Sequence, residues 1–330
     1  MVRNTKAHPY AEQELWWDPI ALDSESSGPV LSEAQVQQWL EDGFLVVTGL
    51  WPEALIEAAA AAAADLHPRE EVAAKRSGFS EQPWAGESGP ENPLNHMTVH
   101  PRAIAAVAQL MDTPETNVRL SQSHVIARWG GLVEPDAQEG DENFGVIQGD
   151  QDIHVDYGNN TLLVPPRLPR PEAVACLCYY SVVEESGGAT HFALPQPGEL
   201  TGYDDEGSSP FNPPNFVAGS SNGSATQPSP VRTEEYTEHL YATERPIRYR
   251  PGACAIYRLD AWHRGTPAAL GKVRYSHHHV WRRADAEWVN WQSLAPRMSG
   301  MPNRYLEQLN VSQRACLGFP PPGNSYWSPQ

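Results

Sequence analysis

Residues 273–283 read VRYSHHHVWRR, a run that has the composition of a β-strand. Because successive side chains of a strand point to opposite sides of its sheet, Arg274, Ser276 and His278 share one side. The two histidines that flank His278 point to the other side, so the three consecutive histidines do not surround one metal ion. We expect them to be hydrogen-bonded side chains of a partly buried strand, with His278 behind a site on the Arg274 side.

Several other stretches have strand character, because short apolar or alternating runs are separated in them by Gly, Pro and Asn. They are FLVVTGL (44–50), NVRLSQSHVIARWG (117–130), AVACLCYYSVV (173–183), GGATHFALP (187–195) and PIRYRPGACAIYRL (246–259). All but the first of these runs follow residue 117, so the second part of the chain is predicted to be rich in β-structure.

The chain before residue 117 has mostly helical spacing instead. The helix predicted from LSEAQVQQWLEDGF (31–44) has Ser32 and Gln35 as a capping box and Gly43 at its C-terminal end. Two more helices are predicted from WPEALIEAAAAAAADLH (51–67) and PRAIAAVAQLMD (101–112). Helices followed by strands predict a mainly β fold: a double-stranded β-helix (jelly roll, cupin-like) core with an N-terminal helical support layer.

The sequence also suggests how the chain is organised. Residues 1–29 lack periodicity and predict a flexible N-terminal arm, residues 30–290 predict one jelly-roll domain that includes the helices, and residues 291–330 predict a C-terminal extension packed on that domain. Within the domain, the polar, Gly- and Pro-rich residues 69–95 predict a loop. Residues 196–231 contain almost no core-forming side chains and predict a long insert, with the length of a lid or a binding loop.

Composition narrows the function classes. The net charge of −18 argues against nucleic acid and acidic membrane surfaces, since both require a basic footprint. No window reaches the roughly eighteen uninterrupted apolar residues of a membrane span, and residues 1–17 lack the apolar core of a signal peptide. The cysteines lie mostly in apolar runs, which predicts buried core positions. We therefore expect a cytoplasmic protein that acts on a small-molecule partner, in an oligomeric state that the sequence leaves open.

A metal site is suggested by His154 and Asp156, which lie two residues apart and share one side if they belong to a strand. Two ligands do not hold a transition metal well, so a third is required. His263 is the best candidate, because it comes just past a predicted strand, where it can reach a barrel rim. Two imidazoles and one carboxylate on one face of a metal form the facial triad of non-heme Fe(II) oxygenases.

A second group follows the third candidate ligand by eleven residues. Arg274 and Ser276 lie on the same side of their strand, and a guanidinium beside a hydroxyl makes a seat for a carboxylate. A co-substrate with two carboxylate ends fits this arrangement, with one end on the metal and the other on Arg274.

The order HVD, then His, then Arg-x-Ser resembles the phytanoyl-CoA dioxygenase family of Fe(II)/2-oxoglutarate oxygenases, which includes ectoine hydroxylase. The resemblance covers most of residues 31–283. LSEAQVQQWLEDGFLVVTGL (31–50) is similar to the family's N-terminal opening, and GGATHFALP (187–195) is similar to the stretch after the metal pair. The chain departs from the family where PQPGEL (195–200) replaces the common Pro-Gly-Ser-His, which concerns the substrate side rather than the metal site.

The resemblance implies an enzyme that uses Fe(II), O2 and 2-oxoglutarate as co-substrate. Such an enzyme hydroxylates an unactivated C–H of a small-molecule metabolite and releases succinate and CO2. The presence of Asp156 favours hydroxylation, because halogenating relatives lack this carboxylate. The resemblance implies that His154, Asp156 and His263 bind iron, and that Arg274 and Ser276 bind the distal carboxylate of 2-oxoglutarate. Arg128 stands where ectoine hydroxylase has a Lys that binds 2-oxoglutarate, and Gln122 stands where that enzyme has a Gln that contacts the substrate.

Two other functions fit the same residues. A Zn(II)-dependent hydrolase or isomerase can use the same three ligands, although it gives no reason for Arg274 and Ser276. A non-enzymatic jelly roll that binds a small molecule is the third hypothesis. For Gln122, a hydrogen-bonded core amide fits the sequence as well as a substrate contact does.

Overall fold

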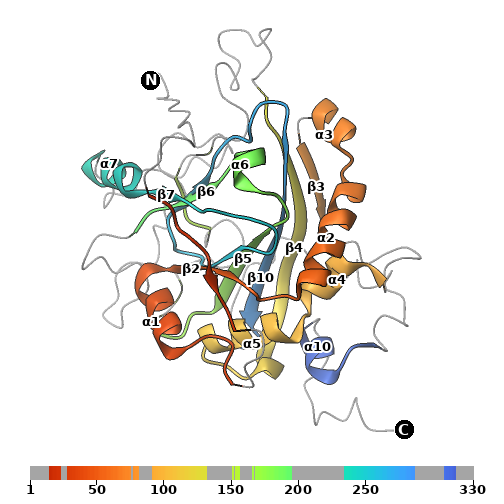
Figure 1. Cartoon of the computed structure of the whole chain (residues 1–330). Coiled ribbons are helices and arrows are strands. Elements are labelled where there is room, and N and C mark those ends of the chain that lie inside the picture. Colours follow the sequence, from red (N-terminus) through yellow and green to blue (C-terminus); the bar gives the residue numbers. More distant parts are fainter. Residues whose placement is uncertain are drawn as a thin grey trace.

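The computed structural model of the chain describes residues 15–23, 28–75, 77–81, 91–131, 151, 153–156, 166, 168–194, 234–286 and 308–316. Its core is built from two β-sheets. The large sheet has the strand order β1-β2-β8-β5-β10-β4-β3 and the small sheet the order β7-β6-β9. The predicted mainly β jelly-roll core, with helices at its N-terminal side, is confirmed (Figure 1).

The strands of the large sheet are β1 (Ile20–Ala21), β2 (Phe44–Thr48), β3 (Ser77–Glu81), β4 (Val118–Trp129), β5 (Ala173–Tyr179), β8 (Cys254–Arg258) and β10 (Val273–Arg283). The strands of the small sheet are β6 (Thr190–Phe192), β7 (Arg245–Pro246) and β9 (His263–Gly265). In the large sheet only β1 pairs in parallel with its neighbour, and the other pairs are antiparallel.

The helices are α1 (Glu33–Asp42), α2 (Glu53–Leu66), α3 (Arg69–Lys75), α4 (Pro93–Thr98), α5 (Pro101–Leu110), the 3-10 helix η3 (Glu115–Asn117), α6 (Val183–Ser186), α7 (Glu234–Thr243) and α10 (Val311–Cys316). In Figure 1, α2, α4, α5 and α10 lie along one side of the large sheet, whereas α6 and α7 lie with the small sheet. None of the helices in the described part of the chain is long and apolar enough to cross a membrane.

The period of two along each strand divides the core into two layers. Along β8, for example, Cys254 and Ile256 face the helices, whereas Ala255 and Tyr257 face the small sheet. Trp39 of α1 is fully buried in the helix-side layer, and its indole N–H donates to the backbone oxygen of Ile256 at 3.1 Å. The four cysteines are free and buried, as predicted.

Helix α1 has the ends that the sequence predicts. The Ser32 hydroxyl accepts from the backbone N–H of Gln35, and the Gln35 side chain accepts from the backbone N–H of Ser32, which completes the capping box. Gly43 ends the helix at φ +87°, a left-handed conformation that disfavours other residues. The strand that follows this turn is β2, so the predicted FLVVTGL strand is confirmed.

The predicted loop at residues 69–95 is wrong in part, since α3, β3 and the start of α4 lie there. Helix α3 is short and buries only Val72, so it has no apolar stripe to detect. Its acidic first turn and its Lys75 at the end instead complement the helix dipole. Strand β3 forms the edge of the large sheet by pairing with β4, a contact that local sequence does not specify.

The predicted flexible arm is wrong for residues 15–23. Strand β1 pairs with β2, Leu22 is buried, and the Trp17 ring packs edge-on against Phe44 at 5.1 Å between centroids. The signal was the pair of aromatic residues at positions 16 and 17. The predicted insert at 196–231 lies outside the described residues, as does most of 291–330; of the latter, Leu309 and Cys316 pack in the helix-side layer.

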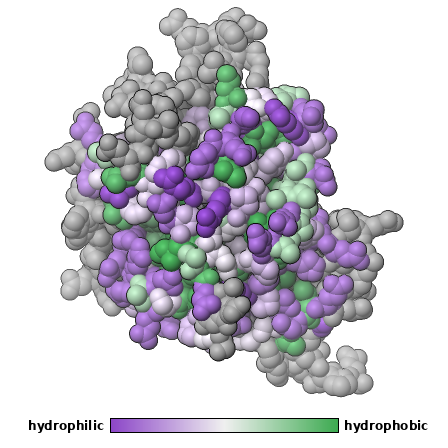
Figure 2. Space-filling view, in the orientation of Figure 1, coloured by the Kyte–Doolittle hydropathy of each residue, from purple (hydrophilic) through white to green (hydrophobic). Residues whose placement is uncertain are grey.

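The surface agrees with the polar composition of the chain. Figure 2 shows hydrophilic side chains spread over the visible face, with apolar residues only in small groups between them.

Candidate metal centre

His154, Asp156 and His263 lie together between the two sheets. The segment that carries His154 runs beside β9, where the backbones of His154 and His263 exchange hydrogen bonds of 2.9 and 3.0 Å in an antiparallel bridge. The bridge sets the two imidazoles side by side, with ring centroids 4.5 Å apart. All three side chains are buried, and one ligand atom of each lies within 4.8 Å of the others.

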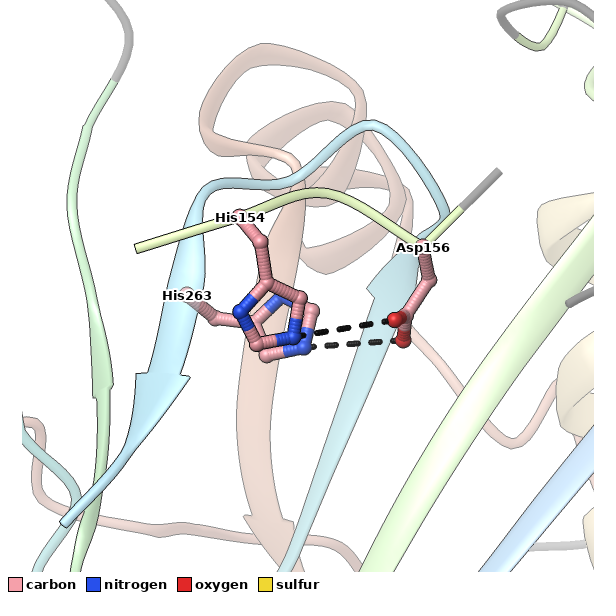
Figure 3. A group of neighbouring side chains, drawn as sticks. All are labelled: His154, Asp156 and His263. Atoms are coloured by element: carbon pink, nitrogen blue, oxygen red, sulfur yellow. Dashed lines mark ion pairs between the residues drawn. The ribbon is translucent and has the colours of Figure 1, made fainter. Parts of the chain in front are cut away.

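The three side chains point at one another (Figure 3). His154 Nε2 lies 3.8 Å from Asp156 Oδ1, and His263 Nε2 lies 3.5 Å from Asp156 Oδ2. The Nδ1 atom of His263 lies 2.9 Å from the backbone oxygen of Ala261. Since that oxygen can only accept, Nδ1 carries the ring hydrogen and Nε2 keeps its lone pair. His263 therefore presents a metal-binding nitrogen to the centre of the group.

The electrostatics of Asp156 favour a charged carboxylate. Burial alone raises the pKa of this group, but the His263 and His154 imidazoles, followed by His278 and a hydrogen bond from Tyr257, lower it below its ordinary value. The group thus offers two imidazole nitrogens and one carboxylate oxygen, a set of donor atoms that suits Fe(II) or Zn(II).

Arg274 and Ser276 lie on the same face of the large sheet as the candidate ligands. Both are buried on β10, and Arg274 is directly opposite Arg128 of β4. Two guanidinium groups opposite each other repel, and burial followed by the Arg274 charge lowers the pKa of Arg128. Such a pair is stabilised when an anion lies between the two charges. The arrangement is therefore suited to binding a carboxylate.

The Arg274 side chain is aimed by the glycine pair of GGATHFALP. One of its terminal nitrogens, Nη1, donates to the backbone oxygen of Gly188. Gly187 and Gly188 both have positive φ, at +60° and +73°, which explains why two glycines stand here. Within the described residues, the Nε of Arg274 and the hydroxyl of Ser276 are buried without a hydrogen-bond partner. Both are therefore available to a bound ligand.

His278 connects the proposed carboxylate-binding residues, Arg274 and Ser276, with the candidate metal ligands. This residue follows Ser276 by two positions on the same face of β10, a step of about 7 Å. His278 contacts Tyr257, and Tyr257 contacts Asp156. His278 thus lies on the Arg274 side of β10, as predicted, and reaches Asp156 through Tyr257. The sequence did not single out Tyr257, whose only signal is its place on a strand that leads to His263.

The other two histidines of the triplet face the helices, as predicted. His277 lies between the hydroxyls of Ser123 and Tyr180, each at 2.9 Å. The expectation of a hydrogen-bonded imidazole is wrong for His279, because neither of its buried ring nitrogens has a hydrogen-bond partner within the described residues. Its ring instead lies against Trp281, with centroids 5.1 Å apart. These are core positions far from the candidate ligands on the opposite face of the sheet.

Gln122 is buried on β4 opposite Val280. It shares the inner face with His124 and lies two positions before it. A substrate contact and a core amide are both compatible with this position.

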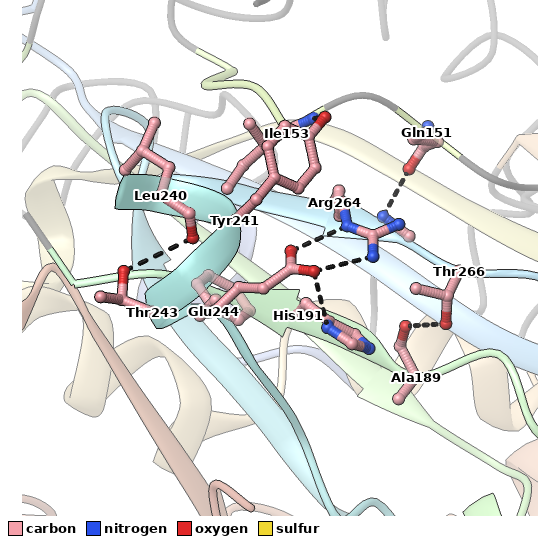
Figure 4. Close-up of polar contacts among 12 residues, drawn as sticks. Gln151, Ile153, Ala189, His191, Leu240, Tyr241, Thr243, Glu244, Arg264 and Thr266 are labelled. Atoms are coloured by element: carbon pink, nitrogen blue, oxygen red, sulfur yellow. Dashed lines mark hydrogen bonds and ion pairs between the residues drawn. The ribbon is translucent and has the colours of Figure 1, made fainter. Parts of the chain in front are cut away.

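A buried ionic cluster supports β9, which carries the candidate ligand His263, and lies beside the segment of His154 (Figure 4). Glu244, directly after α7, receives two hydrogen bonds of 2.8 Å from Arg264 of β9, and its Oε1 lies 3.4 Å from His191 Nδ1 of β6. Burial alone raises the pKa of Glu244, but the adjacent His191 ring and the hydrogen bonds from Arg264 lower it below its ordinary value. The Tyr241 hydroxyl accepts from the backbone N–H of Ile153, beside His154.

The cluster escaped sequence analysis because its members come from three separate elements. Arg264 follows the candidate ligand His263 directly, so the hydrogen bonds from Arg264 to Glu244 hold β9 in place beside the candidate site. The adjacency of Arg264 to His263 was the available signal. No sequence pattern marks its partner Glu244, which comes directly after α7.

We expect Glu244→Gln to lower the free energy of unfolding by about 3–5 kcal/mol, because it leaves the buried Arg264 charge without its partner. Urea unfolding of the two proteins measures this difference. Glu184→Gln is the matched control, since Glu184 pairs with Arg248 at 3.5 Å on the surface and both side chains are about half exposed. Its expected change is about 0–1 kcal/mol. Equal small losses in both variants would contradict a structural role for the cluster.

Comparison with known proteins identifies the fold. No protein-family model and no curated protein matches this sequence. Among solved structures, the chain is similar to the non-heme α-ketoglutarate-dependent carbocyclase SnoK of nogalamycin biosynthesis, with a TM-score of 0.50 and 13% identity over 82% of this chain and 90% of SnoK. This chain has the fold of SnoK. At this identity the similarity shows the fold alone.

Two further structures align with lower scores. EctD from S. alaskensis, solved with 2-oxoglutarate and 5-hydroxyectoine, has a TM-score of 0.49 and 14% identity over 78% of each chain. The α-ketoglutarate-dependent epimerase SnoN has a TM-score of 0.45 and 15% identity over 76% of this chain and 83% of SnoN.

Proposed function

We propose that the protein is a non-heme Fe(II)- and 2-oxoglutarate-dependent dioxygenase that hydroxylates an unactivated C–H of a small-molecule metabolite. One observation carries the proposal: His154, Asp156 and His263 converge on the same interior face as a buried seat for an anion. A metal site alone fits many reactions. A metal site beside two guanidinium groups and a free hydroxyl fits a co-substrate that binds metal at one end and carries a carboxylate at the other.

The residues fit a ferrous ion. His263 has its Nδ1 occupied by a backbone oxygen, which leaves Nε2 free for the metal, and the pKa of Asp156 is lowered. Two imidazoles and one carboxylate fill one face of an octahedral ion and leave the other positions open. We assign His154, Asp156 and His263 as the iron ligands.

The residues also fit 2-oxoglutarate. Arg274 and Ser276 have buried polar atoms without partners among the described residues, and Arg128 adds a second charge from the adjacent strand. We assign Arg274 and Ser276 to the distal carboxylate of 2-oxoglutarate, with Arg128 reinforcing the charge. Gln122 is proposed as a substrate contact on the same face.

With iron, 2-oxoglutarate and O2 bound, the cofactor set supplies the oxidation, in which 2-oxoglutarate becomes succinate and CO2 and the substrate gains a hydroxyl. The protein itself contributes by holding the three metal-binding side chains in place and by excluding water from the site. His154, Asp156 and His263 are each less than 10% exposed, so bulk water has little access to them. SnoK, described as α-ketoglutarate-dependent, shares the fold. We further propose membership of the phytanoyl-CoA dioxygenase family, on the sequence motifs given above.

A turnover experiment tests the proposal. Purified protein with Fe(II) and 2-oxoglutarate is offered a panel of small metabolites, and succinate and O2 consumption are measured together. We expect at least one metabolite to increase both in equal amounts. Product formation without O2, or with Zn(II) in place of Fe(II), would instead identify a hydrolase or isomerase. Binding of metabolites without any turnover would identify a non-enzymatic jelly roll.

A further inference from the structure

Three buried side chains form a chain of hydrogen bonds that ends on Asp156. The Tyr257 hydroxyl donates to Asp156 Oδ2 at 2.8 Å and lies 2.8 Å from His278 Nε2. His278 Nδ1 in turn lies 3.2 Å from His124 Nε2. The three side chains come from β8, β10 and β4, and Tyr257 crosses β5 above Ala175, a residue small enough to leave it room.

The hydrogens in this chain run in one direction. A phenol has one proton, and a charged carboxylate can only accept, so Tyr257 donates to Asp156 and its oxygen accepts from His278. Burial lowers the pKa of His278 to about 4, so its ring is neutral and carries its single hydrogen on Nε2. Its Nδ1 therefore accepts from the Nε2 hydrogen of His124. Each residue in the chain thereby fixes the orientation of the next.

The far end of the chain agrees with this direction. Burial also lowers the pKa of His124 well below its ordinary value, so that ring is neutral too. Its Nδ1 is buried and has no hydrogen-bond partner within the described residues. A lone-pair nitrogen is expected there, because the ring's single hydrogen is used on His278.

We propose that Tyr257 is the positioning residue of the metal site, and that His278 and His124 hold its hydroxyl in the orientation that donates to Asp156. This inference rests on the metal site proposed above. The hydrogen bond draws electron density from Oδ2 and fixes the plane of the carboxylate, so we assign Oδ1, which receives no hydrogen bond from Tyr257, to the metal. Asp156 then acts as a ligand through one oxygen, which keeps the remaining coordination positions open for the co-substrate and O2.

Cobalt(II) binding tests the inference without any substrate. Co(II) is added to purified protein and its visible absorption bands are recorded. We expect Tyr257→Phe to bind Co(II) about 10- to 100-fold more weakly than the wild type. We also expect its bands to change in intensity, because the released carboxylate can bind through both oxygens and so alter the coordination number.

Tyr179→Phe is the matched control. The Tyr179 hydroxyl is also buried, but it donates to Thr190 Oγ1 at 2.6 Å, on β6 of the small sheet, rather than to Asp156. Its loss is expected to lower stability while leaving Co(II) affinity and the absorption bands unchanged. A loss of affinity equal to that of Tyr257→Phe would show that any missing buried hydroxyl weakens the site, and would overturn the inference.

A second pair of variants tests the role of His278. His278→Gln keeps an N–H that can donate to Tyr257, so its Co(II) affinity and bands are expected to match those of the wild type. His278→Leu removes this donor and is expected to weaken binding. Equal behaviour of the two variants would overturn the role of His278, and wild-type affinity in Tyr257→Phe would overturn that of Tyr257. Failure of the wild type itself to bind Co(II) would contradict the metal site.

Discussion

His154→Ala is expected to abolish the visible metal-to-ligand charge-transfer band that the wild type develops with Fe(II) and 2-oxoglutarate under anaerobic conditions. His154 supplies one of three proposed donor atoms, and its backbone bridge to His263 sets the spacing of the other imidazole. The two remaining donors do not hold a transition metal well. The loss of metal affinity should therefore exceed the about 10- to 100-fold loss that is typical when an outer hydrogen-bonding partner is removed.

His239→Ala is the control for this measurement. His239 lies on α7, is partly exposed and does not belong to the three-residue group. The charge-transfer band of His239→Ala is expected to have the same intensity as that of the wild type. A wild-type protein that is folded but shows no band would count against the iron and 2-oxoglutarate assignment as a whole. A band that survives in His154→Ala would show that the metal is held elsewhere.

Arg274→Ala is expected to weaken 2-oxoglutarate binding by about 10- to 100-fold, which corresponds to the loss of one or two charge-assisted hydrogen bonds. The metal should still bind with wild-type affinity, because within the described residues the Arg274 guanidinium donates to the backbone of Gly188 and not to any of the three proposed ligands. Titration with 2-oxoglutarate, followed by the charge-transfer band at saturating Fe(II), measures the first effect. Fe(II) titration alone measures the second.

Arg282→Ala is the matched variant. It removes a guanidinium from the same strand, β10, eight residues away, where the side chain donates to the backbone oxygen of Arg283. Its 2-oxoglutarate affinity is expected to be unchanged. Equal loss of 2-oxoglutarate and metal affinity in Arg274→Ala would show that Arg274 supports the whole site rather than the carboxylate.

Much of the candidate site could be predicted because the spacing of its residues is local. The interval between Arg274 and Ser276 fixes a shared side through the period of β10. His154 lies in an isolated β-bridge and Asp156 in a bend rather than on a strand, so the interval between these two residues placed them near each other without fixing their side. The same period separated His278 from its two neighbours, and the structure places them on opposite faces. The capping box of α1 was also readable, because all of its partners lie within four residues.

The parts that sequence analysis missed depend on contacts between distant segments. Tyr257 and Asp156 are 101 positions apart, and the sequence around neither residue indicates that the two are in contact. Glu244 is unremarkable in sequence until α7 brings it against β9 and β6. The loop predicted at 69–95 failed for a similar reason, since β3 is a strand only through its pairing with β4.

By itself, the sequence determined the class of fold, the ends of α1 and the shared side of β10 to which Arg274 and Ser276 point. Only the tertiary structure decided that His263 stands beside His154, that Arg128 faces Arg274, and that Tyr257 reaches Asp156. The physical reason is that the side-chain period of a strand is a local property of the backbone. The register between strands is set by hydrogen bonds and packing across the whole sheet, and these join residues that are far apart in the chain.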